Sequence, residues 1–354
     1  MRYDRVYNFS ASPAMLPEPV LEEIAAEVLN YHGSGMSVME LNPRSPVLQE
    51  ILTRAETDLR TLARVPDTYQ VLFVPDGAAQ VAMVPMNLMK NGAVCYVETG
   101  VWSKRAIAEA RRYGEVRILA SSADQNFSYI PDCSALDIPD SADYVCIREN
   151  ESANGTAYRE LPDTKGKLLV SDQSSLFLSR PCDISRYGLI WADLPAGMSV
   201  VIIREDLLRD DLPEFVPACL RCRTYAHVAP SVLNGWAVYC CGKLFQYLLS
   251  NGGLEDAARR GAEKAAVLYD FLDQSRFFAN TVQKADRSLT SIPFFSPSRE
   301  QDADVIASAK AAGFVGLAGH ESVGGLRAFI GDAMPREGVA ALAAFLKKYE
   351  AEHS

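Results

Sequence analysis

One carboxylate occupies a position that is typical of ligand-binding residues. Asp172 follows the apolar run Leu168 to Val170 by two residues, at the carboxyl end of a predicted strand. Ligands of open α/β sheets bind just beyond that end of the strands. Aspartates also open turns at strand ends, which is the alternative for this residue. A second stretch of interest, Leu189 to Gly197, joins two apolar runs and contains no lysine.

The cysteines and histidines form no metal-binding pattern. Cys219 and Cys222 make a CxxC pair, but the chain has no second such pair and only four histidines. Eight cysteines are most simply reduced thiols, and Cys240 and Cys241 lie in an apolar helical pattern. We therefore expect no metal site.

Composition and charge limit the class of protein. The 354 residues suffice for one large domain or two ordinary ones, and 48% hydrophobic with 23% charged residues is typical of globular proteins. A net charge of −10 opposes nucleic acid and anionic membranes as partners. Met1 to Ser10 does not resemble a secretory signal, and no apolar stretch reaches membrane-spanning length. We expect a cytoplasmic protein.

Short apolar runs alternate with helical patterns along most of the chain. The predicted strands are Val71 to Val74, Ala93 to Val97, Val116 to Leu119, Tyr144 to Ile147, Leu168 to Val170, Leu189 to Ala192 and Val200 to Ile203. The predicted helices are Glu18 to Tyr31, Val47 to Ala63, Val81 to Met89 and Ser103 to Tyr113. This alternation is typical of an α/β fold with an open, mainly parallel sheet.

The pattern changes from about Gly235, where long helices replace the alternation. Short strands near Thr290 to Phe294 and Leu326 to Ile330 then mix with helices. We therefore expect an N-terminal arm and a large domain over residues 1–255, and a smaller α+β domain over residues 256–354.

Recognisable motifs are spread in order along nearly the whole chain. They are Asn8 to Ala11, Pro13 to Pro17, Ser37 to Glu40, Met83 to Leu88, Ser179 to Pro181, Asp183 to Ile190, Pro195 to Gly197, Arg204 to Leu208, Gly319 with His320, Val323 to Gly325, Arg327 and Ala333 to Pro335. Together these motifs resemble phosphoserine aminotransferase.

The resemblance implies a pyridoxal-phosphate (PLP) enzyme of fold type I, with a mostly parallel seven-stranded type of sheet, a small domain, and a homodimer. The family moves an amino group from glutamate to 3-phosphohydroxypyruvate in serine biosynthesis. Such chemistry needs a lysine that holds the cofactor as an imine, an acid beside the pyridine nitrogen, and donors for two phosphates.

Several cofactor positions of the family are occupied by matching residues. By resemblance, Asp172 pairs with the pyridine nitrogen and Trp102 stacks on the cofactor ring. Ser152 stands where the family commonly has a threonine near the ring oxygen. Gly77 and Ala78 lie in the turn that cradles the cofactor phosphate.

The phosphate and substrate positions depart from the family. Asp76 places a negative charge where the cofactor phosphate should lie, and Val232, expected from the partner subunit, has no donor. Arg44, His320 and Arg327 match substrate-binding positions, but Pro43 and Glu321 replace a histidine and an arginine. The alternative for Arg44 and Arg327 is a solvated or structural ion pair.

The family's catalytic lysine is missing. Between Ala192 and Pro195 the chain has only Asp193 and Leu194, and no lysine occurs between Lys167 and Lys243. Only a lysine distant in sequence, such as Lys104 near Trp102, could replace it.

Three functions are consistent with this pattern. The first is a degenerate, transaminase-inactive homologue whose PLP binding is weak, non-covalent or absent. The second is an active phosphoserine transaminase that uses a distant lysine. The third is a protein that binds a small phosphorylated or carboxylated metabolite, or that acts as a regulatory partner of a true transaminase.

Overall fold

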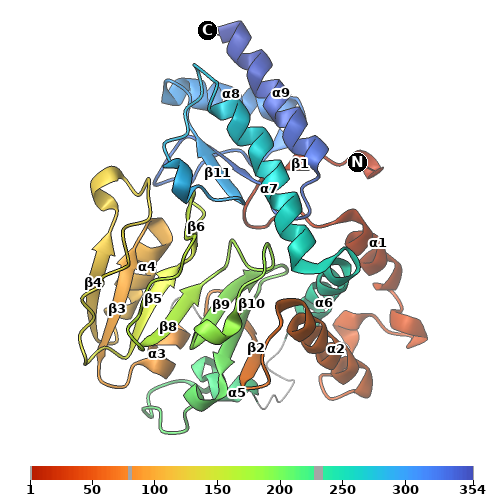
Figure 1. The fold of residues 1–354 in the computed structure, drawn as a ribbon. Coiled ribbons are helices and arrows are strands. Elements are labelled where there is room, and N and C mark those ends of the chain that lie inside the picture. Colours follow the sequence, from red (N-terminus) through yellow and green to blue (C-terminus); the bar gives the residue numbers. More distant parts are fainter. Residues whose placement is uncertain (1, 79–81, 227–233, 354) are drawn as a thin grey trace.

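A seven-stranded sheet forms the centre of the protein, whose computed structural model describes residues 2–78, 82–226 and 234–353 (Figure 1). Its strand order is β2-β10-β9-β8-β5-β3-β4. The strands are β2 (Tyr69–Pro75), β3 (Ala93–Glu98), β4 (Glu115–Ser121), β5 (Tyr144–Arg148), β8 (Leu168–Asp172), β9 (Leu189–Leu194) and β10 (Met198–Arg204). Only β10 runs antiparallel to its neighbours, β2 and β9. The predicted α/β class with a mostly parallel sheet is confirmed.

Apolar side chains cover both faces of this sheet, as a parallel sheet between helices requires. Val71 and Phe73 belong to a core that includes residues of α2 (Pro46–Ala63) and α6 (Gly235–Ser250). Leu72 and Val74 belong to the opposite core, which includes residues of α3 (Val84–Leu88), α4 (Val101–Ala110) and α5 (Cys222–Ala226). The strand period of two thus places successive residues in different cores.

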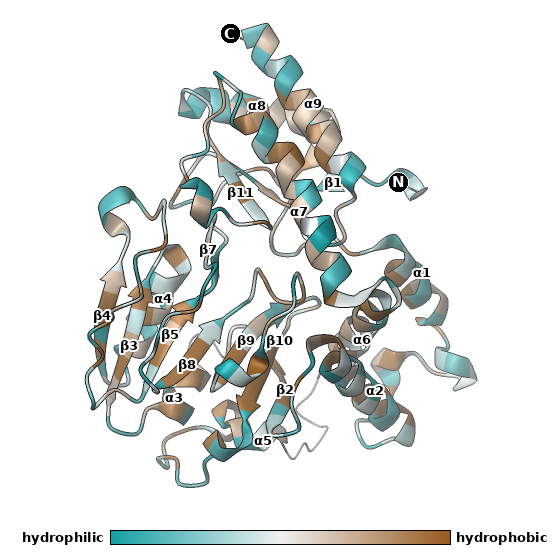
Figure 2. Ribbon diagram, in the orientation of Figure 1, coloured by the Kyte–Doolittle hydropathy of each residue, from teal (hydrophilic) through white to brown (hydrophobic). Residues whose placement is uncertain are grey.

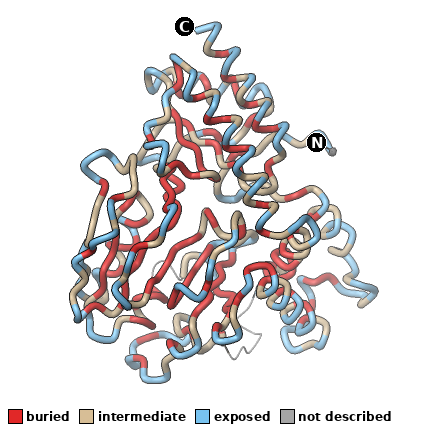
Figure 3. Tube along the Cα trace, in the orientation of Figure 1, coloured by how far each residue is buried: buried red, intermediate tan, exposed pale blue. Residues whose placement is uncertain are grey.

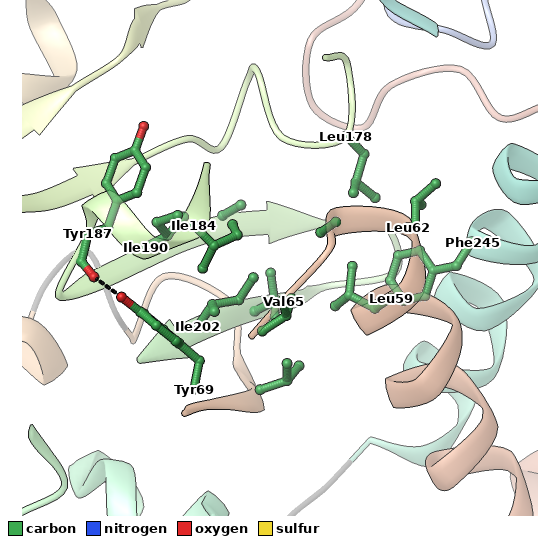
Figure 4. Packing of buried hydrophobic residues seen from close by; sticks show 14 of the residues in the cluster. Leu59, Leu62, Val65, Tyr69, Leu178, Ile184, Tyr187, Ile190, Ile202 and Phe245 are labelled. Atoms are coloured by element: carbon green, nitrogen blue, oxygen red, sulfur yellow. Dashed lines mark hydrogen bonds between the residues drawn. The ribbon is translucent and has the colours of Figure 1, made fainter. Parts of the chain in front are cut away.

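Figure 4 shows the first of these cores at close range. Leu59 and Leu62 of α2 and Phe245 of α6 pack in the same cluster as Ile190 and Ile202 of the sheet. At its edge, the Tyr69 hydroxyl donates to the Tyr187 carbonyl at 2.6 Å, so a buried polar atom is satisfied. The central strands are accordingly the most hydrophobic (Figure 2) and the most buried (Figure 3) parts of the ribbon.

A second layer of structure lies beyond one end of the sheet (Figure 1). It contains α7 (Gly253–Leu272), α8 (Arg299–Ala311), α9 (Arg336–His353), the antiparallel pair β11 (Ser291–Phe294) and β13 (Leu326–Phe329), and the parallel pair β1 (Tyr7–Asn8) and β12 (Phe314–Val315). Phe9 of the N-terminal arm is buried in its core. The expected division at residues 255 and 256 falls in the first turn of α7 and stays a prediction.

Local signals explain where the helices begin and end. The Ser45 hydroxyl caps α2 by accepting from the Leu48 amide at 3.3 Å, and Pro46 occupies the first helical position. The Asn234 side chain caps α6 through the Ala237 amide. The helix α1 (Glu18–Glu27) ends before the predicted Tyr31, because the Asn30 side chain bonds the Gly35 amide in a turn. The helix predicted from Val81 to Met89 corresponds to the shorter helix α3. Its first predicted residue, Val81, lies outside the described part of the chain.

Candidate functional site

Asp172 lies at the carboxyl end of β8, as predicted, and its carboxylate is fully engaged. Its side chain is 3% exposed, and one oxygen accepts from the Ser174 amide at 2.9 Å and from the Ser174 hydroxyl at 2.6 Å. The other oxygen forms an ion pair with Arg148, which is 6% exposed. The register of β5 and β8 pairs these two residues directly. Burial raises the pKa of Asp172, and Arg148 opposes that shift.

Trp102, in the first turn of α4, packs against this ion pair. The Arg148 guanidinium carbon lies 5.3 Å from the centre of the indole ring, within the range of a cation–π interaction. The His320 ring meets the same indole edge-on at 5.5 Å between ring centres. The indole Nε1 is buried, and among the described residues it has no hydrogen-bond partner.

Glu151 interacts with both Trp102 and Arg148. It belongs to the short pair β6 (Asn150–Glu151) and β7 (Thr156–Ala157), and its carboxylate accepts from the Trp102 amide at 3.1 Å and the Ser103 amide at 2.8 Å. A carboxylate at a helix N-terminus compensates the unpaired amides and the helix dipole. Glu151 also lies 3.9 Å from the Arg148 guanidinium, so this arginine has two acidic neighbours.

The space left beside these residues is small. A pocket lined by Trp102, Arg148, Asp172, Tyr96 and Trp191 encloses about 200 Å³, including its open mouth. Because this volume includes open solvent, the enclosed space beside the ion pair is smaller still.

Arg327 of β13 reaches the same region from the C-terminal part of the chain. Its Nη1 lies 3.4 Å from the Ser152 carbonyl, and its Nε is buried without a hydrogen-bond partner in the described part of the chain. Within residues 2–78, 82–226 and 234–353, no carboxylate pairs with this guanidinium, and burial lowers its pKa. The predicted site residues thus form two pairs, Arg327 with Ser152 and Trp102 with His320.

Arg44 is not joined to this group in the described part of the chain. It is exposed in a turn after a capping box at Ser37 and Glu40, and its amide donates to the Asn42 side chain at 2.8 Å. The predicted contribution of Val232 lies outside the described residues.

The turn after β2 carries the expected acid. Gly77 adopts a φ of +73°, and Ala78 follows it without a polar side chain. The Ser199 hydroxyl lies 3.4 Å from an Asp76 carboxylate oxygen and donates to Asp193 at 2.8 Å. Asp76, which the resemblance places at the cofactor phosphate, therefore shares the Ser199 hydroxyl with Asp193.

The strands around the missing lysine are intact. Leu194 of β9 pairs with Met198 of β10, so three residues, Pro195 to Gly197, make the whole turn. Lys104 lies on α4 with its amine 5.6 Å from the centre of the Phe127 ring. It makes no contact with Asp172 in the described part of the chain.

Comparison with known proteins places this chain in a family. The model of the class-V aminotransferases matches residues 6–342. A phosphoserine aminotransferase of Acidithiobacillus ferrooxidans is 44% identical over 361 residues, covering 98% of this chain and 99% of that protein. The chain belongs to the class-V aminotransferase family. The predicted resemblance is confirmed.

Solved structures of this family share the fold at full length. Phosphoserine aminotransferase from Bacillus circulans subsp. alkalophilus has a TM-score of 0.95 at 36% identity, covering 99% of this chain and 100% of that one. PLP-bound phosphoserine aminotransferase from Trichomonas vaginalis has a TM-score of 0.90 at 33% identity, covering 97% and 100%. The fold type I architecture is therefore confirmed.

The residues present do not fit PLP in the way that the family uses it. The cofactor needs an acid for its ring nitrogen, donors for its phosphate and a lysine for its aldehyde. Here Asp172 is already paired with Arg148, and Asp76 presents a carboxylate at the phosphate position, with Asp193 bonded to the same Ser199 hydroxyl. The turn from Pro195 to Gly197 contains no lysine.

Sequence reasoning missed Arg148 and Glu151. Arg148 directly follows the apolar run Tyr144 to Ile147, much as Asp172 follows the run Leu168 to Val170. A charged residue at the end of a buried strand was therefore the signal that could have identified Arg148. No group of three or more possible metal ligands occurs in the described ranges, and no helix among them is long and apolar enough to cross a membrane.

Proposed function

We propose that this protein is a phosphoserine aminotransferase homologue that no longer transaminates. The observation that carries the proposal is the closed β9–β10 turn, in which Pro195 to Gly197 join paired strands without a lysine. Transamination needs an amine at this position both to hold the cofactor and to move a proton. Positioned acid–base catalysis alone contributes about 100- to 10,000-fold, so its loss is severe.

Weak or absent PLP binding is the second part of the proposal. A phosphate dianion beside Asp76 and Asp193 meets like charges instead of donors. The ring nitrogen finds the carboxylate of Asp172 already held by Arg148. The first arrangement disfavours binding of the PLP phosphate, and the second disfavours binding of its ring nitrogen.

A small carboxylate or phosphate metabolite is the ligand that we propose for the open part of the site. The support is the pair of buried donors without partners, Trp102 Nε1 and Arg327 Nε, together with the nearby His320 ring. Buried donors without partners are costly, and an anion would satisfy them.

We also propose that the protein acts as a homodimer. The support is a group of exposed apolar side chains close together in sequence, Leu29, Met36 and Met39. Apolar groups that stay exposed in one chain are often buried between subunits. A heterodimer with an active transaminase is the alternative, and sedimentation of the purified chain alone distinguishes the two.

Absorption spectroscopy tests the loss of transamination. We expect the purified protein mixed with PLP to show no protein-bound imine band, and borohydride treatment to label no single lysine. An active phosphoserine aminotransferase treated in parallel is the positive control. A specific label on one lysine, with turnover of glutamate and 3-phosphohydroxypyruvate, contradicts the proposal and supports a distant lysine such as Lys104.

A further inference from the structure

The Arg148 guanidinium contacts both an aromatic ring and a carboxylate. Its carbon lies 5.3 Å from the centre of the Trp102 indole, and its Nη1 donates to Asp172. The Arg148 Nε donates to the Asn150 carbonyl at 3.1 Å, which fixes the plane of the group. Arg148, Trp102 and Asp172 come from three different elements, β5, α4 and β8.

These contacts are those that a protonated pyridine ring would make. A guanidinium is flat, positively charged, stacks on aromatic rings and presents N–H donors in its plane. A pyridinium ring shares all four properties. A carboxylate and an indole that line the same pocket can therefore bind either group, but the two groups cannot occupy that place together.

We propose that Arg148 is a built-in substitute for the cofactor ring, which fills the ring position and excludes aromatic ligands from this site. The inference rests on the proposed loss of PLP function, and it names the residue that decides which ligands the site accepts. The anion donors of Arg327 and Trp102 are left open, so the site takes small aliphatic carboxylates or phosphates.

Two buried carboxylates stabilise the Arg148 side chain in this position. Asp172 and Glu151 both face it, and both are buried. Removing one member of a buried ion pair leaves an uncompensated charge, which is strongly unfavourable. A ligand that displaced Arg148 would therefore have to replace its charge as well as its volume.

Binding of pyridoxamine 5′-phosphate to arginine variants tests the proposal. This probe has the cofactor ring but no aldehyde, so surface lysines cannot capture it. We expect Arg148→Ala to bind it about tenfold or more tightly than the wild type, because Asp172 becomes free to accept from the ring nitrogen. Adding Asp172→Asn to that variant should remove most of the gain.

Arg105→Ala is the matched control. Arg105 is exposed and also approaches the Trp102 indole, at 5.9 Å, but no ion pair joins it to Asp172 in the described residues. We expect this variant to bind the probe as weakly as the wild type does. A folded Arg148→Ala protein with wild-type affinity, or an equal gain in Arg105→Ala, overturns the proposal.

Chemical rescue covers the case in which Arg148→Ala does not fold. Refolding with tens of millimolar guanidinium chloride should then restore folded protein, because the free cation occupies the vacated position, whereas urea, its flat neutral analogue, should not. Equal recovery with both, or with neither, overturns the proposal. The proposed function fails separately, through an imine band and turnover in the wild type.

Discussion

Arg148 is buried and Arg327 is half-buried, and their surroundings differ in charge. Arg148 has the carboxylates of Asp172 and Glu151 beside it. Arg327 has a single carbonyl contact, and in the described part of the chain no acid pairs with it. A desolvated cation without a counter-ion favours an anionic ligand. The proposed ligand binding therefore falls to Arg327, and the proposed closure of the ring position to Arg148.

Replacing Arg327 by glutamine should weaken the binding of small anions. We expect Arg327→Gln to lower the affinity for glutamate by about tenfold or more, since a charge-assisted hydrogen bond is lost. Isothermal titration calorimetry measures the change. Arg259→Gln, which alters an exposed arginine of α7 and the net charge equally, is the control. Equal affinities of Arg327→Gln and wild type would remove Arg327 from the site.

Among the elements, the β9–β10 hairpin combines an intact ladder with a short turn. The strands stay paired from Leu189 with Ile203 to Leu194 with Met198, so the missing residues affect the turn alone. Ala196 and Gly197 both have positive φ, at 65° and 75°. This left-handed backbone is strained for residues other than glycine.

Backbone strain in that turn gives a stability prediction. Gly197 is exposed, and nothing lies within 4 Å of an added Cβ, so Gly197→Val should act through the backbone alone. We expect it to lower the free energy of unfolding by about 1 to 2 kcal/mol.

Gly261→Ala provides the control of opposite sign. Gly261 lies inside α7 with open space around it and no positive φ. This change should raise the free energy of unfolding by about 0.5 to 1 kcal/mol. Urea denaturation measures both variants. A neutral result for Gly197→Val would show that the turn adapts.

For the whole molecule, the segment from 285 to 290 joins the central sheet region to the second layer. The Ser288 amide donates to the Gly155 carbonyl at 2.8 Å, and Arg159 donates to the Arg287 carbonyl at 2.6 Å. Arg287 itself forms two hydrogen bonds with Asp273 at the end of α7. Contacts between distant parts of the chain thus converge on Arg287.

The pair of Asp273 and Arg287 should make stability depend on pH. Hydrogen bonds from Arg287 lower the pKa of Asp273 to about 2, below the value near 3.9 in an unfolded chain. The stabilisation is therefore complete above about pH 4 and is lost as the pH falls through about 2.

Asp273→Asn tests this pH dependence. We expect it to cost about 1 to 2 kcal/mol at pH 7, with a difference from wild type that shrinks from about pH 4 to pH 2. Denaturation curves across that range measure it. Asp270→Asn, at an exposed position of the same helix, should show no such trend. A difference independent of pH would exclude the ion pair as its cause.

Local patterns predicted much of this fold, because buried strands and amphipathic helices leave clear periods in the sequence. The apolar runs before Arg148 and Asp172 identified β5 and β8 correctly. Their mutual register could not be predicted, since it depends on contacts between residues that are 24 positions apart. The pairing of β1 with β12 and the contact of Trp102 with His320 are likewise products of tertiary packing. The positions of Asp172 and Trp102 in the fold were therefore predictable from the sequence, but the ion pair between Arg148 and Asp172 was not.

The position of Arg148 also affects how the stability of the folded state depends on ligand concentration. A protein stabilised by a dissociable ligand loses stability as the free ligand is depleted, in proportion to the logarithm of its concentration. Arg148 is attached to the chain, so its occupancy of the position between Trp102 and Asp172 is independent of any concentration. The thermal midpoint of unfolding of this protein should accordingly be the same in cells with high or low concentrations of PLP.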